Sequence, residues 1–186
     1  MKILVTGAAG FIGANLCEYL LDKGYDVAGL DNFNDYYSPE IKEFNIESFQ
    51  SNPKFKLHRV DITDRGALLK VFTEGTHSGT GAFDSVVHLA AWAGVTPSLK
   101  RPSIYAEVNY VGTNNLAEFA SQNKVKNFIF ASTSSVYGNN NVTPFKEDMD
   151  TSHPAAPYPA SKKAGEVLLY SYSLNTDMGV TVLRFF

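Results

Sequence analysis

The 186-residue chain has a single cysteine, Cys17, so it can form no intrachain disulfide, and a reducing compartment is expected. It also lacks a basic excess: 16 Lys and Arg face 19 Asp and Glu, and the resulting net charge of −3 predicts no binding of nucleic acid or of an anionic membrane. No apolar run approaches the ~18 residues of a membrane-spanning helix, and the apolar start of the chain is too short for an export signal. These absences predict a soluble, cytoplasmic protein.

Histidine is sparse as well. None of the four histidines has a second ligand at metal-binding spacing, so no metal site is predicted. His88 ends an apolar run and is expected to be a buried strand residue with partners for its ring. Cys17 lies in an apolar helical segment and is expected to act as a small buried hydrophobe rather than as a nucleophile.

Short apolar runs alternate along the chain with longer segments of helical period. The predicted strands are residues 3–6, 26–30, 55–60, 85–89, 127–131 and 180–185. The predicted helices are residues 11–23, 39–50, 65–73, 104–123 and 158–175, and residues 75–81 are predicted to be a flexible surface connection. Near-continuous apolar strands alternating with helices indicate an α/β fold, a doubly wound parallel sheet with helices on both faces.

A glycine-rich turn follows the first predicted strand and opens the first predicted helix. Its sequence is Gly7-Ala8-Ala9-Gly10-Phe11-Ile12-Gly13. Glycines allow the backbone to approach a pyrophosphate at a helix N-terminus. Asp31 follows about 20 residues later, at the end of the second strand, where a carboxylate binds the ribose 2′-hydroxyl and would repel a 2′-phosphate. The order of these features predicts a site for NAD rather than NADP, in a Rossmann-type domain spanning residues 1–186.

Tyr158 and Lys162 stand four residues apart in a predicted helix, which places them on one face. A tyrosine has a pKa near ~10 and needs a nearby cation to act as a base at neutral pH. Such a pair can move a proton to or from a sugar or alcohol hydroxyl. Taken alone, the same spacing also fits an ordinary helix surface.

The motifs along the chain resemble those of the extended short-chain dehydrogenase/reductase family, in that family's order. They are the glycine turn, Asp61-Ile62, His88-Leu89-Ala90-Ala91, Thr133-Ser134-Ser135-Val136-Tyr137-Gly138, and the pair Tyr158 and Lys162. The resemblance implies a pyrophosphate site at Gly7, Gly10, Phe11, Ile12 and Gly13. It also implies that Asp31 and Asn32 hold the adenosine ribose, that Asp61 and Ile62 hold the adenine, and that Leu89, Ala90 and Ala91 line the cofactor path. For the last five residues, strand-end packing is the alternative.

The residues after the fifth strand separate the reactions of this family. Its 4,6-dehydratases resemble one another in an Asp-Glu pair before Val-Tyr-Gly, and its decarboxylating xylose synthases keep a Glu there. This chain has no acid before Val136, so the resemblance implies a sugar-nucleotide 4-epimerase. Tyr158 would take the proton of the sugar 4-hydroxyl, and Lys162 would lower the Tyr158 pKa and hydrogen-bond the nicotinamide ribose. Thr133 would bind the 4-oxygen, with Ser134 and Ser132 as second choices.

Two segments are similar to those of UDP-glucuronate 4-epimerases. They are Leu30-Asp31-Asn32-Phe33-Asn34-Asp35-Tyr36-Tyr37 and Ala91-Trp92-Ala93-Gly94-Val95. Trp92 stands where those enzymes usually have a polar residue, and Thr96-Pro97 replaces their usual Arg-Tyr. The arginine matters because it would pair with a sugar carboxylate. The implied substrate is a UDP-sugar, UDP-glucuronate or UDP-galacturonate.

Three hypotheses for the function remain open at this point. The first is an epimerase whose substrate-binding C-terminal lobe is absent, because the sixth apolar run is unfinished at Phe186; such a fragment is expected to have little activity. The second is a non-catalytic NAD-binding module, and the third an oxidoreductase that makes a net reduction. A homodimer is also expected, by resemblance, from pairing of helices 104–123 and 158–175. Their apolar residues are Val108, Val111, Leu116 and Phe119 in the first helix and Val167, Leu168 and Tyr170 in the second.

Overall fold

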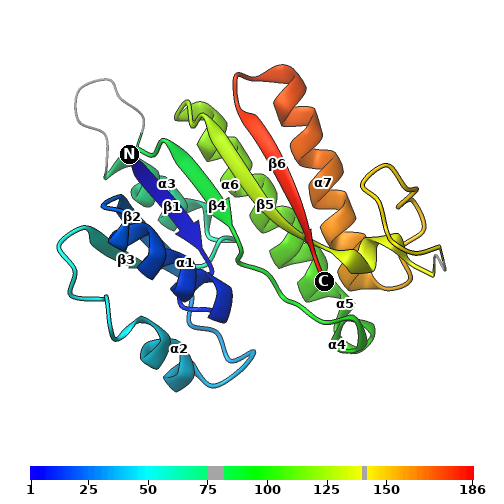
Figure 1. Ribbon diagram of the computed structural model, residues 1–186, viewed down its shortest axis with the longest axis horizontal. Helices are drawn as coiled ribbons and strands as arrows, with labels where there is room; N and C mark the ends of the chain where they lie inside the picture. Colours follow the sequence, from blue (N-terminus) through cyan, green and yellow to red (C-terminus); the bar gives the residue numbers. More distant parts are fainter. Residues whose placement is uncertain (75–81, 140–141) are drawn as a thin grey trace.

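The computed structural model describes residues 1–74, 82–139 and 142–186, so the predicted connection at 75–81 lies outside the described residues. In the described part of the chain the strands form one parallel sheet of order β3-β2-β1-β4-β5-β6 (Figure 1). Their bounds are β1 Lys2–Thr6, β2 Asp26–Asp31, β3 Phe55–Arg59, β4 Ser85–His88, β5 Asn127–Thr133 and β6 Gly179–Phe185. The predicted doubly wound parallel sheet is confirmed.

The helices follow the predicted segments closely. They are α1 Phe11–Asp22, α2 Pro39–Ile46, α3 Arg65–Thr73, α4 Val95–Lys100, α5 Pro102–Tyr105, α6 Thr113–Gln122 and α7 Pro157–Asn175. A π-helical segment, η1 Ala106–Gly112, joins α5 to α6, and a 3₁₀ turn, η2 Ser134–Tyr137, follows β5. Helix α4 was not predicted, because six residues with an internal proline give no helical period. None of the helices in the described ranges is long and apolar enough to cross a membrane.

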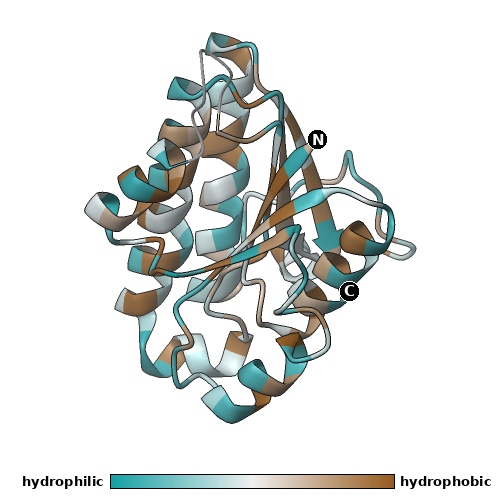
Figure 2. Ribbon diagram, turned by 90° about the vertical axis from the view of Figure 1, so that its left-hand side faces the viewer, coloured by the Kyte–Doolittle hydropathy of each residue, from teal (hydrophilic) through white to brown (hydrophobic). Residues whose placement is uncertain are grey.

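The sheet separates two hydrophobic cores. Helices α3, α6 and α7 cover one face. There Leu68, Leu116 and Leu169 belong to one core cluster with Val86 and Phe128 of the sheet. Helices α1 and α2 cover the other face, where Cys17 packs among the apolar side chains of β1 and β2. Cys17 is fully buried and burial raises its pKa to about 12, which confirms the prediction of a buried small hydrophobe. Figure 2 shows the hydrophobic residues, in brown, along the strands and the adjoining helices.

The order in which successive strands join the sheet reverses between β1 and β4, although all the strands are parallel. Strands β2 and β3 are added on one side of β1, whereas β4, β5 and β6 are added on the other side. In open parallel sheets a crevice forms at such a reversal, beyond the carboxyl ends of the strands. The glycine turn after β1 and residues 89–94 after β4 both lie at this point. The topology therefore brings together motifs that lie about 80 residues apart in the sequence.

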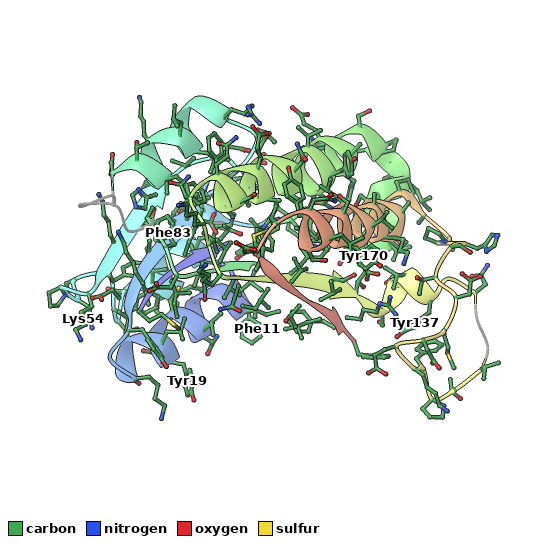
Figure 3. All side chains as sticks on the ribbon, turned by 90° about the horizontal axis from the view of Figure 1, so that it is seen from above. Phe11, Tyr19, Lys54, Phe83, Tyr137 and Tyr170 are labelled. Carbon is green, nitrogen blue, oxygen red and sulfur yellow. The ribbon has the colours of Figure 1, made fainter. Side chains whose placement is uncertain are left out.

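The predicted apolar stripe on helix 104–123 is divided between two surfaces. Leu116 and Phe119 are buried against the sheet, whereas Val111 is 46% exposed. On α7, Val167 and Tyr170 are exposed, and Figure 3 shows Tyr170 on that helix. The two buried residues therefore belong to the core and are not available to a partner. Val111, Val167 and Tyr170 remain on the surface.

Candidate active site and cofactor cleft

The turn after β1 has room only for glycine at its two ends. Gly7 has a φ of +70°, and a Cβ added there would lie 2.9 Å from the backbone nitrogen of Ala90. A Cβ added at Gly13 would lie 2.0 Å from the carbonyl oxygen of Gly7. Any side chain at either position would push the turn away from the N-terminus of α1 or from the loop after β4. The two glycines therefore keep a close backbone approach at the floor of the crevice.

The N-terminus of α1 has the features of an anion site. Helix α1 begins after Gly10 without a side-chain cap, so the N–H groups of its first turn remain available to a ligand. Close by, the buried hydroxyl of Tyr37 has no hydrogen-bond partner among the described residues, and it lies 3.7 Å from the position of a Cβ on Gly10. Buried hydroxyl groups are normally satisfied. An uncapped helix end beside an unsatisfied hydroxyl fits the diphosphate of a dinucleotide.

Asp31 ends β2 as predicted, but its carboxylate is already well partnered. It accepts hydrogen bonds from the backbone N–H groups of Ala9, at 3.2 Å, and Phe33, at 2.9 Å. The ammonium group of Lys42 lies 3.4 Å from Asp31 Oδ1 and donates to Asn34 Oδ1 at 2.9 Å. Both side chains of this ion pair are only 6% exposed. Sequence reasoning missed Lys42, because a lysine in a short polar helix gives no signal of burial.

Asn32 and Asp61 meet at the ends of β2 and β3. The Asn32 amide donates to Asp61 Oδ2 at 2.6 Å, and Asp61 Oδ1 accepts from both the backbone N–H and the hydroxyl of Thr63. Burial raises the pKa of Asp61, but the hydrogen bonds from Thr63 and Asn32 outweigh burial and lower the pKa below its ordinary value. The carboxylate is therefore ionised at neutral pH, and it fixes the Asn32 amide at the rim of the crevice.

Two adjoining cavities contain the residues predicted from the sequence. The smaller, about 120 Å³, is lined by Gly7, Gly10, Asp31, Asn32, Asp61, Ile62, Leu89, Ala90 and Ala91, with Tyr37 and Lys42. The larger, about 490 Å³, is lined by Gly7, Gly10, Phe11, Ile12, Gly13, Leu89, Ala91, Thr133, Tyr158 and Lys162, with Ser132 and Ser134. Because both cavities include Gly7, Gly10, Leu89 and Ala91, they form one cleft at the carboxyl ends of β1 and β4, where the strand order reverses. Every residue predicted for the site lies along it.

Tyr158 and Thr133 meet at the larger cavity. The Thr133 hydroxyl accepts a hydrogen bond from the backbone N–H of Ser135 at 3.1 Å, which leaves its own proton free to be donated. Burial raises the pKa of Tyr158, and a hydrogen bond from Thr133 lowers it in part. Of the two second choices, Ser132 instead donates to Glu166 Oε1 at 2.5 Å. The hydrogen bonding therefore favours Thr133 over Ser132 as the hydroxyl that works with Tyr158.

Lys162 lines the same cavity as Tyr158 and is buried against β5. Its side chain is 3% exposed, and its ammonium group lies 4.3 Å from the centre of the Phe130 ring. Burial lowers the Lys162 pKa to about 7, although Glu166 raises it. Lys162 is not among the groups that shift the pKa of Tyr158, which ends above its ordinary value. Burial is the largest influence on the pKa of both residues, and the lowering of the Tyr158 pKa by Lys162 stays a prediction.

Asn109 is a site residue that sequence reasoning missed. It lies in the π-helical segment and is 1% exposed. Its side chain accepts from the Trp92 N–H at 2.8 Å and donates to the Trp92 carbonyl at 2.9 Å and to Ser161 Oγ at 3.0 Å. It therefore fastens the loop after β4 to helix α7, next to Lys162. An asparagine within an apolar helical stripe is the one signal that the sequence offered.

An aromatic cluster borders Tyr158 on the side of the loop after β4. The Tyr105 ring packs edge-on against Tyr158 at 6.1 Å between centroids, and Trp92 packs edge-on against Tyr36 at 5.3 Å. The hydroxyls of Tyr36 and Tyr105 both donate to the carbonyl of Ala93, at 3.1 and 2.7 Å. The two hydroxyls are thus fixed on one carbonyl of the loop after β4.

His88 is buried beneath the cleft and takes no part in a metal site. Its Nδ1 lies 2.7 Å from Thr6 Oγ1 and its Nε2 lies 2.9 Å from Thr113 Oγ1. The prediction of a buried histidine with a satisfied ring is confirmed. Burial, and then the charge of Lys162, lower the His88 pKa well below its ordinary value, so the ring is neutral. Within the described ranges no group of three metal-binding side chains occurs.

The chain matches a family model described as GDP-mannose 4,6 dehydratase over residues 4–186. A curated relative, the UDP-glucuronate 4-epimerase of Thermodesulfobacterium geofontis, is 40% identical over 183 residues, which are 98% of this chain and 54% of the relative. The chain therefore spans about half the length of the curated relatives it matches.

Solved structures of this fold include enzymes with different chemistry. UDP-glucuronic acid 4-epimerase from Bacillus cereus, in complex with UDP-glucuronic acid and NAD, has a TM-score of 0.86 and 39% identity over 99% of this chain and 56% of that one. The dTDP-glucose 4,6-dehydratase of Streptomyces venezuelae, with NAD bound, has the same TM-score at 29% identity, covering 99% of this chain and 55% of that one. Both are described with NAD, whereas their reactions differ.

Proposed function

The chain belongs to the GDP-mannose 4,6-dehydratase family of sugar-nucleotide enzymes, and from this premise we propose that it is the NAD-binding part of an NAD-dependent UDP-sugar 4-epimerase. The proposed substrate pair is UDP-glucuronate and UDP-galacturonate. The observation that carries the proposal is that Thr133, Tyr158, the buried Lys162 and the glycine turn all line one cavity. The absence of an acid before Val136 favours epimerisation over dehydration.

The test is to incubate the protein, in the length its gene encodes, with UDP-glucuronate and to follow the sugar by proton NMR. Formation of UDP-galacturonate without net change in NADH absorbance is expected. Loss of water to a 4-keto-6-deoxy product would identify a dehydratase instead. Stoichiometric consumption of NADH or NADPH would identify a net reductase, and NAD binding without turnover of any UDP-sugar would favour a non-catalytic module.

The cleft supports a defined placement of the cofactor. Gly7, Gly10, Phe11, Ile12 and Gly13 would surround the diphosphate, with the Tyr37 hydroxyl as a further donor. Asp31 and Asn32 would hold the adenosine ribose, Asp61 and Ile62 the adenine, and Leu89, Ala90 and Ala91 the path toward the nicotinamide. Bound NAD supplies a hydride acceptor and donor and, when oxidised, a positive ring charge.

In the proposed reaction Tyr158 as phenolate would take the proton of the sugar 4-hydroxyl, and the oxidised NAD held in the cleft would supply the acceptor for the C4 hydride. Thr133 would donate a hydrogen bond to the 4-oxygen, and Lys162 would hydrogen-bond the nicotinamide ribose. After the 4-keto sugar turned over in the site, the reduced cofactor would supply the hydride to the opposite face of C4, and Tyr158 would return the proton to the 4-oxygen. The net redox change is zero. Because burial raises the pKa of Tyr158, positive charge must be present in the cleft for the phenolate to form at neutral pH.

The protein is expected to bind NAD more tightly than NADP, and Asp31→Ala should narrow or reverse that preference. Asp31 repels a 2′-phosphate, but Lys42 lies 3.4 Å from Asp31 Oδ1 and would attract the phosphate once the carboxylate is removed. Calorimetric titration with both oxidised cofactors measures the ratio of dissociation constants. Asp26→Ala, an exposed acid at the start of β2, is the matched control and should leave the ratio unchanged. Equal binding of both cofactors by the unsubstituted protein would contradict the role assigned to Asp31.

A homodimer formed through η1 and α7 is expected. Tyr110, Val111, Val167 and Tyr170 are each at least 41% exposed, and large apolar side chains at a surface favour association. Val167→Lys should therefore weaken the dimer, which light scattering over a concentration series would measure. Ile41→Lys, an equally apolar residue exposed on α2, is the matched control. A monomer at all concentrations would contradict this use of the surface.

A further inference from the structure

A line of buried polar side chains runs from the cofactor cleft to helix α7. Thr6, His88, Thr113, Asn109 and Ser161 are each at most 7% exposed. They come from five different elements, β1, β4, α6, η1 and α7. Buried polar groups need hydrogen-bond partners, whereas apolar side chains of the same shape would need none. The reaction proposed above uses none of these five side chains.

The first part of the line joins β1 to β4, which lie side by side (Figure 1). Thr6 and His88 are direct neighbours in the sheet, and Thr6 Oγ1 lies 2.7 Å from His88 Nδ1. The same oxygen accepts the backbone N–H of Ala90 at 3.2 Å. Ala90 lines the cofactor cleft, and its backbone nitrogen lies 2.9 Å from the position of a Cβ on Gly7. The line therefore begins where the loop after β4 meets the glycine turn.

The second part of the line joins β4 to the first turn of α7. His88 Nε2 lies 2.9 Å from Thr113 Oγ1, and Thr113 donates to the carbonyl of Asn109 at 2.6 Å. The Asn109 side chain donates to Ser161 Oγ at 3.0 Å. Ser161 in turn donates to the backbone carbonyl of Tyr158 at 2.7 Å. The line therefore ends on the backbone of the residue that carries the phenol.

The hydrogen bonds in this line can have only one direction. A hydroxyl has a single proton, and Thr113 gives its proton to the Asn109 carbonyl, so it can only accept from His88. His88 must then carry its proton on Nε2, and because the ring is neutral its Nδ1 accepts from Thr6. The N–H and the carbonyl of Trp92, at 2.8 and 2.9 Å, fix the orientation of the Asn109 amide.

We propose that His88, in the Nε2–H tautomer, is a positioning residue for Tyr158: through Thr113, Asn109 and Ser161 it fixes the first turn of α7 relative to the floor of the cofactor cleft. A shift at either end would leave a buried donor or acceptor without its partner, and such a shift is unfavourable. The effect on turnover rests on the proposed epimerase reaction, whereas the His88 tautomer and the position of Tyr158 do not.

The first experiment determines the His88 tautomer by ¹H–¹⁵N NMR of the chain labelled at its histidines, with the ring assigned by through-bond correlation to its own backbone. The Nε2–H tautomer is expected at neutral pH, because Thr113 accepts from Nε2. A proton on Nδ1 in the unsubstituted chain would overturn the proposal.

Thr113→Val nearly keeps the shape of the side chain but removes the acceptor of the Nε2 proton. The ring proton is then expected to move to Nδ1, where Thr6 Oγ1 can accept it, because a buried N–H without a partner is unfavourable. Thr113→Ser keeps the hydroxyl and should keep the Nε2–H tautomer. A ring that stays in the Nε2–H tautomer in Thr113→Val would contradict the assigned line of bonds.

Thr176→Val is the matched control for Thr113→Val. Thr176 also accepts from a donor outside its own turn, the N–H of Met178 at 3.2 Å, and also donates to the carbonyl four residues earlier, that of Tyr172 at 2.8 Å. It stands at the other end of α7, after Asn175. This variant should leave the His88 tautomer unchanged.

The second experiment measures the far end of the line by NMR of the chain labelled with ¹³C at tyrosine Cζ. The Tyr158 resonance is assigned as the one lost in Tyr158→Phe. Thr113→Val is expected to shift this resonance, and Thr113→Ser to leave it close to its original position. An unshifted Tyr158 resonance in Thr113→Val would show that the line does not position Tyr158.

Ser161→Ala covers the case in which Thr113→Val does not fold, because it removes only the last hydroxyl of the line. It too should shift the Tyr158 resonance, and an unshifted resonance would overturn the proposal. Ser173→Ala is the matched control. Ser173 donates to the carbonyl three residues earlier, that of Tyr170 at 2.8 Å, as Ser161 does to that of Tyr158, but near the end of α7.

The activity arm uses the protein in the length its gene encodes. Ser161→Ala is expected to lower kcat about tenfold with little change in KM, since a misplacement of 1 Å costs ~10²-fold and a smaller one costs less. Ser173→Ala should change neither constant. A raised KM with an unchanged kcat in Ser161→Ala would count against positioning of Tyr158. Absence of epimerisation by the unsubstituted protein would refute the proposed function, and the two NMR experiments would still decide the role of His88.

Discussion

Replacing Tyr158 with phenylalanine is expected to lower epimerase turnover about 10²- to 10⁴-fold, the usual loss when a general acid–base group is removed. The substitution removes only the hydroxyl of Tyr158, which lines the larger cavity together with Thr133, and keeps the ring that packs edge-on against Tyr105. The dissociation constant for NAD should therefore change by no more than a few-fold. Turnover is measured by NMR of the sugar nucleotide, and cofactor binding by calorimetry.

Tyr172→Phe is the matched control for this experiment. Tyr172 is on the same helix, its hydroxyl donates to Asn114 Oδ1 at 3.3 Å, and its ring packs against the core. Its loss should cost little turnover, because the hydroxyl lies outside the cleft. Near-normal turnover in Tyr158→Phe would show that another group moves the proton and would remove the central argument for the proposed reaction.

Replacing Lys162 with methionine is expected to abolish turnover and at the same time to stabilise the fold. Burial lowers the Lys162 pKa from its ordinary value of 10.5 to about 7, which corresponds to at most ~5 kcal/mol of unfavourable burial of the cation. Methionine is similar in length and carries no charge to bury. We expect the free energy of unfolding to increase by ~2 kcal/mol, which raises Tm by roughly 4–8 °C for a chain of this size.

The same substitution should change how stability depends on pH. Because the Lys162 pKa is lower in the folded chain than in the unfolded chain, the unfolded chain binds more protons between about pH 7 and 10.5. The free energy of unfolding therefore rises with pH across that window, and Lys162→Met should flatten the rise. Urea unfolding at a series of pH values measures it.

Lys163→Met is the control for the stability effect. Lys163 is adjacent in sequence, its side chain is 28% exposed, and it lies 3.4 Å from Glu166 Oε2. This variant should not raise Tm. A lower Tm in Lys162→Met would show instead that the lysine stabilises the fold. Its burial would then no longer indicate that it is present for a function.

The two TM-scores of 0.86 explain why the fold does not decide the chemistry of this chain. An epimerase and a 4,6-dehydratase share the same sheet, helices and NAD cleft. The difference rests on which side chains follow β5, where this chain has Ser134 and Ser135 and no carboxylate before Val136. The choice between the two reactions therefore depends on these residues and not on the architecture.

The sheet, the glycine turn and the cleft that contains Tyr158 could be predicted from the amino-acid sequence alone. These follow from local patterns: apolar runs of strand length, glycines where a side chain would clash, and a four-residue spacing on a helix. The charges around the site, in contrast, depend on how distant segments pack in the folded chain. These charges involve contacts between segments that are far apart in the sequence or on different elements. The contacts are those of Lys42 with Asp31, Asn109 with Ser161, and Arg184 with Glu166.

The pKa values of Tyr158 and Lys162 depend on burial, which arises only when β4, β5 and α7 pack together. Periodicity along one segment carries no information about that packing, and for this reason the burial of Lys162 and Tyr158 could not be predicted from their spacing.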